Sequence, residues 1–141
     1  MTPSMSTLLV VDDDAAIRTM YSRSLASLGT VEQAEGGRQA LQMLGANRYE
    51  AIVLDLHMPG IDGFTVLEMI AKDDHVNRDT PVFVVTGDTS EQVRVRALKL
   101  RSLFLMTKPV PLVMLKSIIE SSMKKNAARP PSDPVRVPKK V

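Results

Sequence analysis

The chain has 141 residues, of which 44% are hydrophobic and 24% are charged, and this composition fits one globular domain rather than a disordered or fibrous protein. It contains no cysteine, which excludes disulfides, thiolate metal sites and a cysteine nucleophile. The net charge of +2 combines a basic C-terminal segment with a mildly acidic remainder, so we expect no nucleic-acid binding by the folded part and, without a long apolar run, no membrane span.

From the N-terminus onward, five short apolar segments alternate with five segments of helical periodicity. The apolar segments, predicted to be β-strands covered on both faces, are residues 7–11, 30–34, 51–54, 81–85 and 103–106. Asp14 is placed to cap the first helix, and Pro111 falls in the first turn of the last one. This alternation predicts an α/β fold: a doubly wound, five-stranded parallel sheet, flavodoxin-like (βα)5, with strand order 2-1-3-4-5.

The fourth helical segment carries apolar side chains on two opposite sides. Val93, Ala97 and Leu100 form one stripe, and Val95 and Leu98 form the other. Only one stripe can fully face the sheet. The count of residues between the flanking strands favours Val95 and Leu98 facing inward, which leaves the other stripe as a candidate partner or dimer surface.

The C-terminal segment differs in composition from the rest. Residues 1–125 are predicted to form one domain, and residues 126–141 a basic, proline-rich, flexible tail. Residues 123–141 carry six basic side chains and one acidic one. Residues 1–6 lack the pattern of a signal peptide, so we expect a cytoplasmic protein.

Acidic side chains follow two of the predicted strands. Asp12, Asp13 and Asp14 come directly after the first strand, and Asp55 comes directly after the third. In the order 2-1-3-4-5 these strands are neighbours at the point where the order reverses, which is where open α/β sheets bind ligands. Carboxylates are the hard oxygen ligands that Mg²⁺ prefers. Asp12, Asp13 and Asp55 therefore predict a magnesium site that positions a phosphoryl group, whereas a metal site built on the ring of His57 is not expected.

Two further polar side chains end the last two strands at the same edge of the sheet. Thr86 lies in VVTGD (84–88) and Lys108 lies in MTKPV (106–110). A lysine ammonium pairs with a phosphate oxygen, and a threonine hydroxyl donates to one. The bond between Lys108 and Pro109 is a candidate for the cis form.

These segments resemble the receiver domain of two-component response regulators. The resemblance covers residues 7 to about 125 and rests on four motifs: LVVDDD (9–14), VLDLHMPGIDG (53–63), VVTGD (84–88) and MTKPV (106–110). It implies a stand-alone, chemotaxis-regulator-like switch that is not an enzyme beyond its own phosphorylation and dephosphorylation.

The resemblance also implies a role for each matching residue. Asp55 would accept a phosphoryl group from a sensor histidine kinase or a phosphotransfer protein, Thr86 would be the switch hydroxyl, and Lys108 would pair with the phosphate. The implied Mg²⁺ ligands are Asp12, Asp13, Asp55 and the backbone carbonyl of His57. The implied partners are the kinase or phosphotransfer protein, a downstream protein target and a second copy of the chain in a homodimer.

One position departs from the family's pattern. Three residues before Lys108 the family usually has an aromatic side chain, whereas this chain has Leu105, with Phe104 beside it. Leucine has neither a ring nor a hydroxyl, so it cannot act as the usual aromatic switch. We expect phosphorylation to be retained and the geometry of the output to differ.

Other functions were weighed against the signalling switch. A phosphatase of the haloacid dehalogenase type needs an acidic residue two positions after Asp55, where this chain has His57. The sequence has neither GxxxxGK nor GxGxxG, which argues against a nucleotide-binding protein. Two alternatives stay open: a phosphorylation-independent adaptor, and a receiver fragment of a larger response regulator with an output domain.

Overall fold

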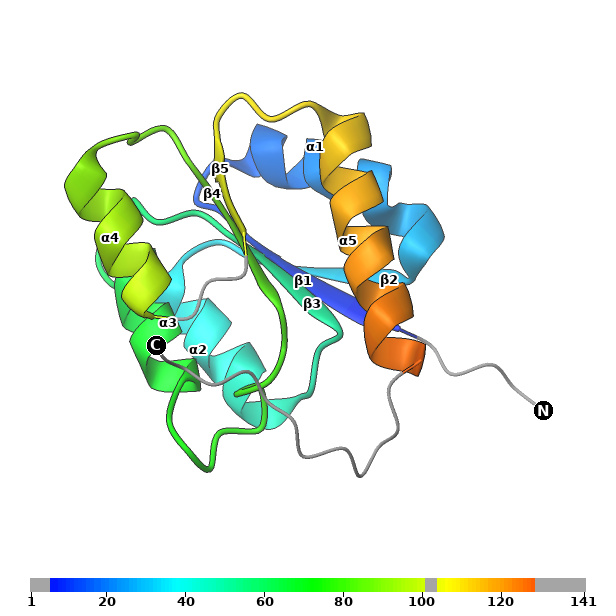
Figure 1. The fold of residues 1–141 in the computed structure, drawn as a ribbon, viewed down its shortest axis with the longest axis horizontal. Helices are drawn as coiled ribbons and strands as arrows, with labels where there is room; N and C mark the ends of the chain where they lie inside the picture. The colour runs from blue at the N-terminus through cyan, green and yellow to red at the C-terminus, as the bar shows by residue number, and fades with distance from the viewer. Residues whose placement is uncertain (1–5, 101–103, 129–141) are drawn as a thin grey trace.

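The computed structural model describes residues 6–100 and 104–128, and it contains a five-stranded parallel sheet between two layers of helices (Figure 1). The strands are β1 (Thr7–Val11), β2 (Thr30–Ala34), β3 (Ala51–Leu54), β4 (Val82–Thr86) and β5 (Phe104–Thr107). The helices are α1 (Ala15–Leu25), α2 (Gly37–Ala46), α3 (Gly63–Ile70), α4 (Glu91–Lys99) and α5 (Leu112–Ala128), with a short 3-10 helix, η1 (Ala26–Leu28), after α1. The strand order β2-β1-β3-β4-β5 confirms the predicted fold.

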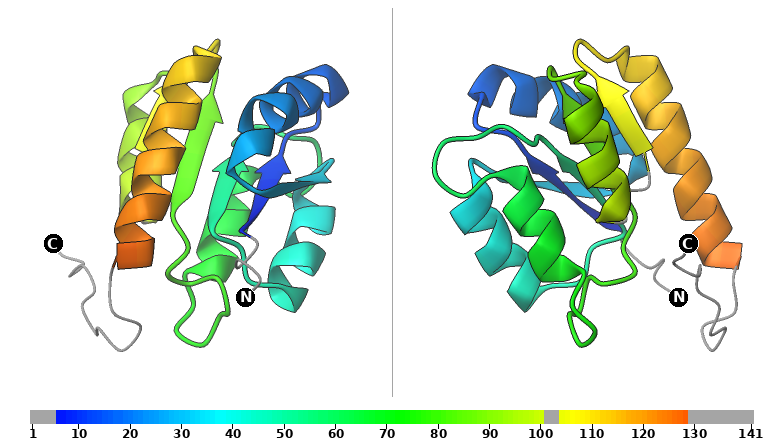
Figure 2. Two further views of the ribbon diagram at one scale, coloured as in Figure 1. Left: turned by 90° about the vertical axis from the view of Figure 1, so that its right-hand side faces the viewer. Right: turned by 60° about the vertical axis from the view of Figure 1, so that its left-hand side comes forward.

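The two faces of the sheet bury separate apolar cores, because side chains alternate along each strand. On β1, Leu8 and Val10 pack with residues of α1 and α5, whereas Leu9 and Val11 pack with residues of α2, α3 and α4. Figure 2 shows these two helical layers on opposite sides of the sheet. Strands β3 and β4 are buried along their whole length, while β5, at the edge of the sheet, is partly exposed.

The register of the sheet places the C-terminal ends of the strands side by side. The last residues of β1 and β3 pair with each other, so Asp12 and Asp55 follow them at the same level on neighbouring strands. The last residues of β4 and β5, Thr86 and Thr107, also pair, and Lys108 therefore continues beside the end of β4. The polar side chains at the C-terminal ends of four strands therefore lie at the same end of the sheet.

At the other end of the sheet, where the strands begin, one buried side-chain amide connects several segments. Asn77 is fully buried, and its side-chain nitrogen donates to the carbonyls of Leu44 (2.7 Å) and Asn47 (2.8 Å). Its side-chain oxygen accepts from the backbone N–H of Tyr49 (2.9 Å) and from the hydroxyl of Thr80 (2.9 Å). These bonds connect the end of α2 and the loops that precede β3 and β4.

The orientation of α4 differs from the prediction. Val93 and Ala97 are buried against the α2–α3 side of the sheet and Leu100 packs on the same core, whereas Val95 and Leu98 are 43% and 63% exposed. The predicted inward stripe is therefore the exposed one, and the candidate partner surface is part of the core. The reason is the spacing: three apolar residues at i, i+4 and i+7 cover two turns continuously, which buries more apolar area than a pair.

The structure confirms the predicted cap of the first helix and places both ends of the last helix differently from the prediction. The carboxylate of Asp14 caps α1 by accepting from the backbone N–H groups of Ala16 (2.9 Å) and Ile17 (3.2 Å). Pro111 lies immediately before α5 rather than inside its first turn. Helix α5 extends to Ala128 and so includes the first three residues of the predicted tail, and the rest of the predicted tail lies outside the described residues. None of the helices in residues 6–100 and 104–128 is long and apolar enough to cross a bilayer.

Candidate functional site

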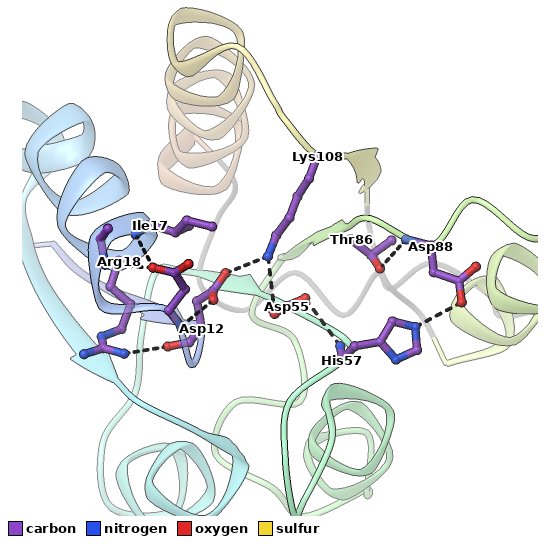
Figure 3. Close-up of polar contacts among 10 residues, drawn as sticks. Asp12, Ile17, Arg18, Asp55, His57, Thr86, Asp88 and Lys108 are labelled. Carbon is purple, nitrogen blue, oxygen red and sulfur yellow. Dashed lines mark hydrogen bonds and ion pairs between the residues drawn. The ribbon is translucent and has the colours of Figure 1, made fainter.

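An open pocket lies at the carboxyl edge of the sheet, where the strand ends converge. Its lining residues are Asp12, Asp13, Asp14, Ile17, Asp55, His57, Gly87, Asp88 and Lys108. Figure 3 shows the polar lining residues Asp12, Asp55, His57, Asp88 and Lys108, with their contacts to one another and to neighbouring residues. The structure therefore brings together Asp12, Asp13, Asp55 and Lys108, which the sequence analysis placed in one site.

Three carboxylates form the acidic side of the pocket. Asp12 and Asp55 are almost fully buried, Asp13 is exposed, and one carboxylate oxygen from each lies within 4.8 Å of the others. Burial raises the pKa of Asp55, and the neighbouring charge of Asp12 raises it further, with only partial compensation from Lys108. A cluster of three carboxylate oxygens with this spacing fits a small, hard cation such as Mg²⁺.

Lys108 provides the positive charge opposite these carboxylates. Its Nζ atom lies 3.0 Å from Asp12 Oδ2 and 3.4 Å from Asp55 Oδ2. Burial alone would lower the pKa of Lys108, but the hydrogen bond to Asp12 and the charges of Asp55 and Asp12 outweigh it, so the pKa is raised. The backbone N–H of Lys108 donates to the carbonyl of Thr86 (2.9 Å), and the Lys108–Pro109 bond is cis, as the sequence suggested.

The backbone around Asp55 is fixed by close main-chain contacts. The N–H of Asp55 donates to the carbonyl of Val11 (3.0 Å), and the N–H of Gly63 donates to the carbonyl of Leu56 (2.9 Å). A Cβ atom at Gly63 would lie 2.5 Å from the carbonyl oxygen of Asp55, so only glycine allows the chain to return this closely. On the other side, Arg18 Nη1 donates to the carbonyl of Asp12 (2.7 Å). These contacts hold both carboxylates in place.

Thr86 lies at the end of β4 but is not part of the pocket lining. It is buried, and its Oγ1 atom accepts from the backbone N–H of Asp88 (3.1 Å). The next residue, Gly87, is exposed, and a Cβ atom there would meet no other group within 4 Å. The backbone at Gly87 is therefore not packed against another segment on the side where a side chain would lie.

The side chain of His57 makes a contact that the sequence did not predict. Its Nε2 atom lies 3.1 Å from Asp88 Oδ2, across the mouth of the pocket (Figure 3). The backbone N–H of His57 donates to Asp55 Oδ1 at 3.4 Å. The two partners of the side-chain contact are 31 residues apart and lie in different loops, so no local sequence pattern could have paired them.

The first two residues of β5, Phe104 and Leu105, face opposite sides of the sheet. Leu105 packs against the core beneath α4, on the face that Thr86 shares through the β4–β5 pairing. Phe104 stacks on Phe83 instead, with ring centroids 5.2 Å apart and an angle of 8° between the rings. Phe104 therefore cannot replace the missing aromatic side chain at position 105.

Known proteins resemble this chain in sequence and in structure. A model of the response regulator receiver domain matches residues 8–120. Response regulator MprA of Mycolicibacterium vanbaalenii is 40% identical over 92 residues, which are 64% of this chain and 38% of that protein. Response regulator PleD of Caulobacter vibrioides is 36% identical over 115 residues, which are 81% of this chain and 25% of that protein. The receiver domain of the Francisella response regulator 1452 superposes with a TM-score of 0.78 at 28% identity, covering 86% of this chain and 98% of that one.

Proposed function

The chain belongs to the response regulator receiver family, and from this premise we propose that it is a phosphorylation-dependent switch whose phosphoryl acceptor is Asp55. Receiver domains are signalling domains that interact with histidine kinases and downstream targets. In the proposed function a histidine kinase or phosphotransfer protein supplies the phosphoryl group, and the partner-binding surface changes in response. We propose a cytoplasmic location for this exchange.

One observation carries the proposal. Lys108 Nζ lies between Asp12 and Asp55, at 3.0 Å and 3.4 Å, beside the cluster of three carboxylates. A carboxylate that attacks phosphorus needs its own charge and the charge of the donor to be neutralised, and it needs little other covalent help. The arrangement of one buried nucleophile, one ammonium and two further oxygen ligands meets this need.

The proposed reaction is an in-line transfer to Asp55. A carboxylate oxygen of Asp55 attacks phosphorus, the bond from phosphorus to the donor's imidazole nitrogen breaks, and that nitrogen keeps the electron pair. Lys108 would exchange its contact with Asp55 for one with a phosphoryl oxygen, and the hydroxyl of Thr86 would donate to another phosphoryl oxygen. The product is an acyl phosphate with a total charge of about −1.5 to −2, which replaces the single negative charge of the Asp55 carboxylate.

The proposal includes a bound Mg²⁺ ion. Its ligands would be Asp12, Asp13, Asp55 and the backbone carbonyl of His57, of which the three carboxylates already lie within 4.8 Å of one another. When bound, the ion neutralises charge on the phosphoryl oxygens. Asp12 and Asp13 would hold the ion, and Asp12 would at the same time release part of its contact with Lys108.

The test is incubation with a small phosphodonor and Mg²⁺, followed by measurement of the intact mass. The parent chain should gain one phosphoryl group, Asp55→Asn should gain none, and removal of the metal with a chelator should block the gain. The matched control is Asp62→Asn, because Asp62 caps α3 through a hydrogen bond from Thr65 N (3.0 Å) that asparagine can also accept. An Asp55→Asn protein that is modified as fast as the parent would overturn the assignment of Asp55.

We also propose an alternative in which this chain is part of a larger protein. The chain spans 38% of MprA and 25% of PleD, so both relatives contain segments beyond the matching region. This supports the second possibility that the chain serves as the receiver part of a larger response regulator. A phosphorylation-independent adaptor remains the alternative if the parent chain gains no phosphoryl group under any condition.

A further inference from the structure

A continuous series of hydrogen bonds leads from Asp55 to the first turn of α4. The backbone N–H of His57 donates to Asp55 Oδ1 (3.4 Å), and the imidazole Nε2 of His57 contacts Asp88 Oδ2 (3.1 Å). The other oxygen of Asp88 accepts from the backbone N–H of Ser90 (2.9 Å), and the hydroxyl of Ser90 accepts from the N–H of Val93 (3.3 Å). The last contact caps the N-terminus of α4.

The direction of the contact between His57 and Asp88 follows from the chemistry of the carboxylate. Hydrogen bonds from Ser90, and then from the His57 ring, lower the pKa of Asp88, so this group is ionised at neutral pH and can only accept. The ring nitrogen of His57 is therefore the donor. We call this contact the His57–Asp88 bridge. It connects the loop after β3 with the loop after β4 (Figure 3).

We infer that the His57–Asp88 bridge links the phosphorylation state of Asp55 to the first turn of α4: it is closed in the unphosphorylated protein and opens when Asp55 carries a phosphoryl group. The inference rests on the proposed function of Asp55. It makes His57 and Asp88 positioning residues, because they act on α4 through Ser90 and do not react themselves.

Charge and geometry give the direction of the change. His57 and Asp88 both line the pocket in which the phosphoryl group would sit. A phosphoryl dianion there repels the carboxylate of Asp88 and competes for the donors that face it. The hydroxyl of Thr86, which now accepts from the N–H of Asp88 at 3.1 Å, lies outside the pocket lining and would have to move toward the pocket to donate to a phosphoryl oxygen. Both changes move Asp88 away from His57 and loosen the Ser90 cap.

The bridge also supplies a coupling that the β5 strand lacks. Leu105 has no ring that could swing in response to Thr86, and Phe104 is stacked on Phe83 on the other face of the sheet. The residue after Thr86 is also loosely packed, because no atom outside its chain neighbours lies within 4 Å of a Cβ atom built at Gly87. A side-chain bridge at the mouth of the pocket is therefore a direct connection from Asp55 to α4.

The expected effect is modest, because the side chains of His57 and Asp88 are 56% and 36% exposed. Exposed pairs change equilibria by about two- to fivefold. The readout is amide hydrogen exchange at Val93 and Arg94, whose N–H groups bond to the side chain and the carbonyl of Ser90. In the parent chain, a small phosphodonor with Mg²⁺ should speed exchange at these amides by about two- to fivefold.

The decisive variant is His57→Ala, which removes the bridge and leaves the contacts of Asp88 with Ser90 in place. Without phosphodonor, the amides of Val93 and Arg94 should already exchange faster in this variant than in the parent. Phosphodonor should then add little to the exchange rate, after correction for the fraction of protein that intact mass shows to be phosphorylated. His57→Gln, whose amide nitrogen can donate to Asp88, should restore the difference between the two states. Asp88→Ala removes the same bridge and also the contact with Ser90 N, so it should speed exchange at least as much as His57→Ala. The double variant should add little to Asp88→Ala, because the bridge is already absent there.

The outcomes separate the two levels of the proposal. If the parent chain gains no phosphoryl group, the proposed function fails and the bridge has no signal to carry. If the parent is phosphorylated, and folded His57→Ala and Asp88→Ala proteins show the parent's exchange rates and the parent's response at Val93 and Arg94, the inference about the bridge is wrong. Circular dichroism establishes folding, and each of the two variants tests the bridge if the other does not fold.

Discussion

On the β1–β3 side of the pocket, Asp12 and Asp55 are buried and their backbone is held by main-chain hydrogen bonds and by the close approach of Gly63. On the β4–α4 side, Gly87 is exposed and Asp88 is held by single hydrogen bonds to His57, to Ser90 and to the hydroxyl of Thr86. Main-chain contacts within a packed core are hard to rearrange, whereas exposed side-chain contacts exchange at little cost. The difference indicates that the β1–β3 side is the more rigid and that the β4–α4 side rearranges more easily, which suits the roles proposed for Asp55 and Asp88.

The largest expected effect comes from removing the positive charge that faces the carboxylates of the pocket. Lys108→Ala removes the only lysine among the pocket residues, which leaves the charge on the phosphoryl group without a pre-positioned ammonium. We expect the rate of phosphorylation by a small phosphodonor to fall by about 10²- to 10³-fold. The control is Lys99→Ala, an exposed lysine at the end of α4. A fall of less than about tenfold would mean that Lys108 contributes little to the reaction.

A second substitution tests the rigidity of the β1–β3 side. A methyl group at Gly63 would lie 2.5 Å from the carbonyl oxygen of Asp55 and 2.7 Å from the Cα atom of Leu56, and neither backbone atom can move freely. Gly63→Ala should lower the free energy of unfolding by about 1–3 kcal/mol, measured by urea denaturation. Gly45→Ala, where no atom lies within 4 Å, should leave stability unchanged or raise it by up to about 1 kcal/mol. Equal effects at the two glycines would contradict this difference.

A third comparison lies within α4. Val93 is buried and Val95 is 43% exposed, although both belong to one helix and are the same residue type. Val93→Ala should destabilise the protein by about 2 kcal/mol, because it removes two buried methyl groups and leaves a cavity. Val95→Ala should change stability by no more than about 0.5 kcal/mol. A larger loss of stability in Val95→Ala than in Val93→Ala would instead support the orientation of α4 that the sequence alone suggested.

The smallest expected effect concerns pH and Asp55. Burial and the charge of Asp12 raise the pKa of Asp55 in the folded protein above its value of about 3.9 in the unfolded chain. Folding therefore favours the protonated form, so this contribution to stability is complete below the unfolded pKa and is lost as the pH rises through the folded pKa. Without metal, Asp55→Asn should unfold at a higher temperature than the parent at pH 7, and the gain should shrink toward zero below about pH 4. The exposed change Asp74→Asn is the control; a gain independent of pH would disprove the stated cause.

The strand ends could be predicted from sequence, but contacts between loops could not. Each strand is an unbroken apolar run, and a parallel sheet brings the residues that follow such runs to one edge, so Asp12, Asp55 and Lys108 were predicted to meet. The orientation of α4 was wrong because its two apolar stripes look alike until the helix is placed on the sheet. The His57–Asp88 bridge depends on the paths of two loops, which no periodicity describes.

The buried amide of Asn77 restricts which residue types can occupy this position. Both donors and both acceptor directions of its side chain are occupied, by Leu44, Asn47, Tyr49 and Thr80. An aspartate would turn two carbonyl groups against a buried charge, and a glutamine would be one methylene too long for all four partners. We therefore expect other residue types at this position to weaken the contacts that join the end of α2 to the loops before β3 and β4.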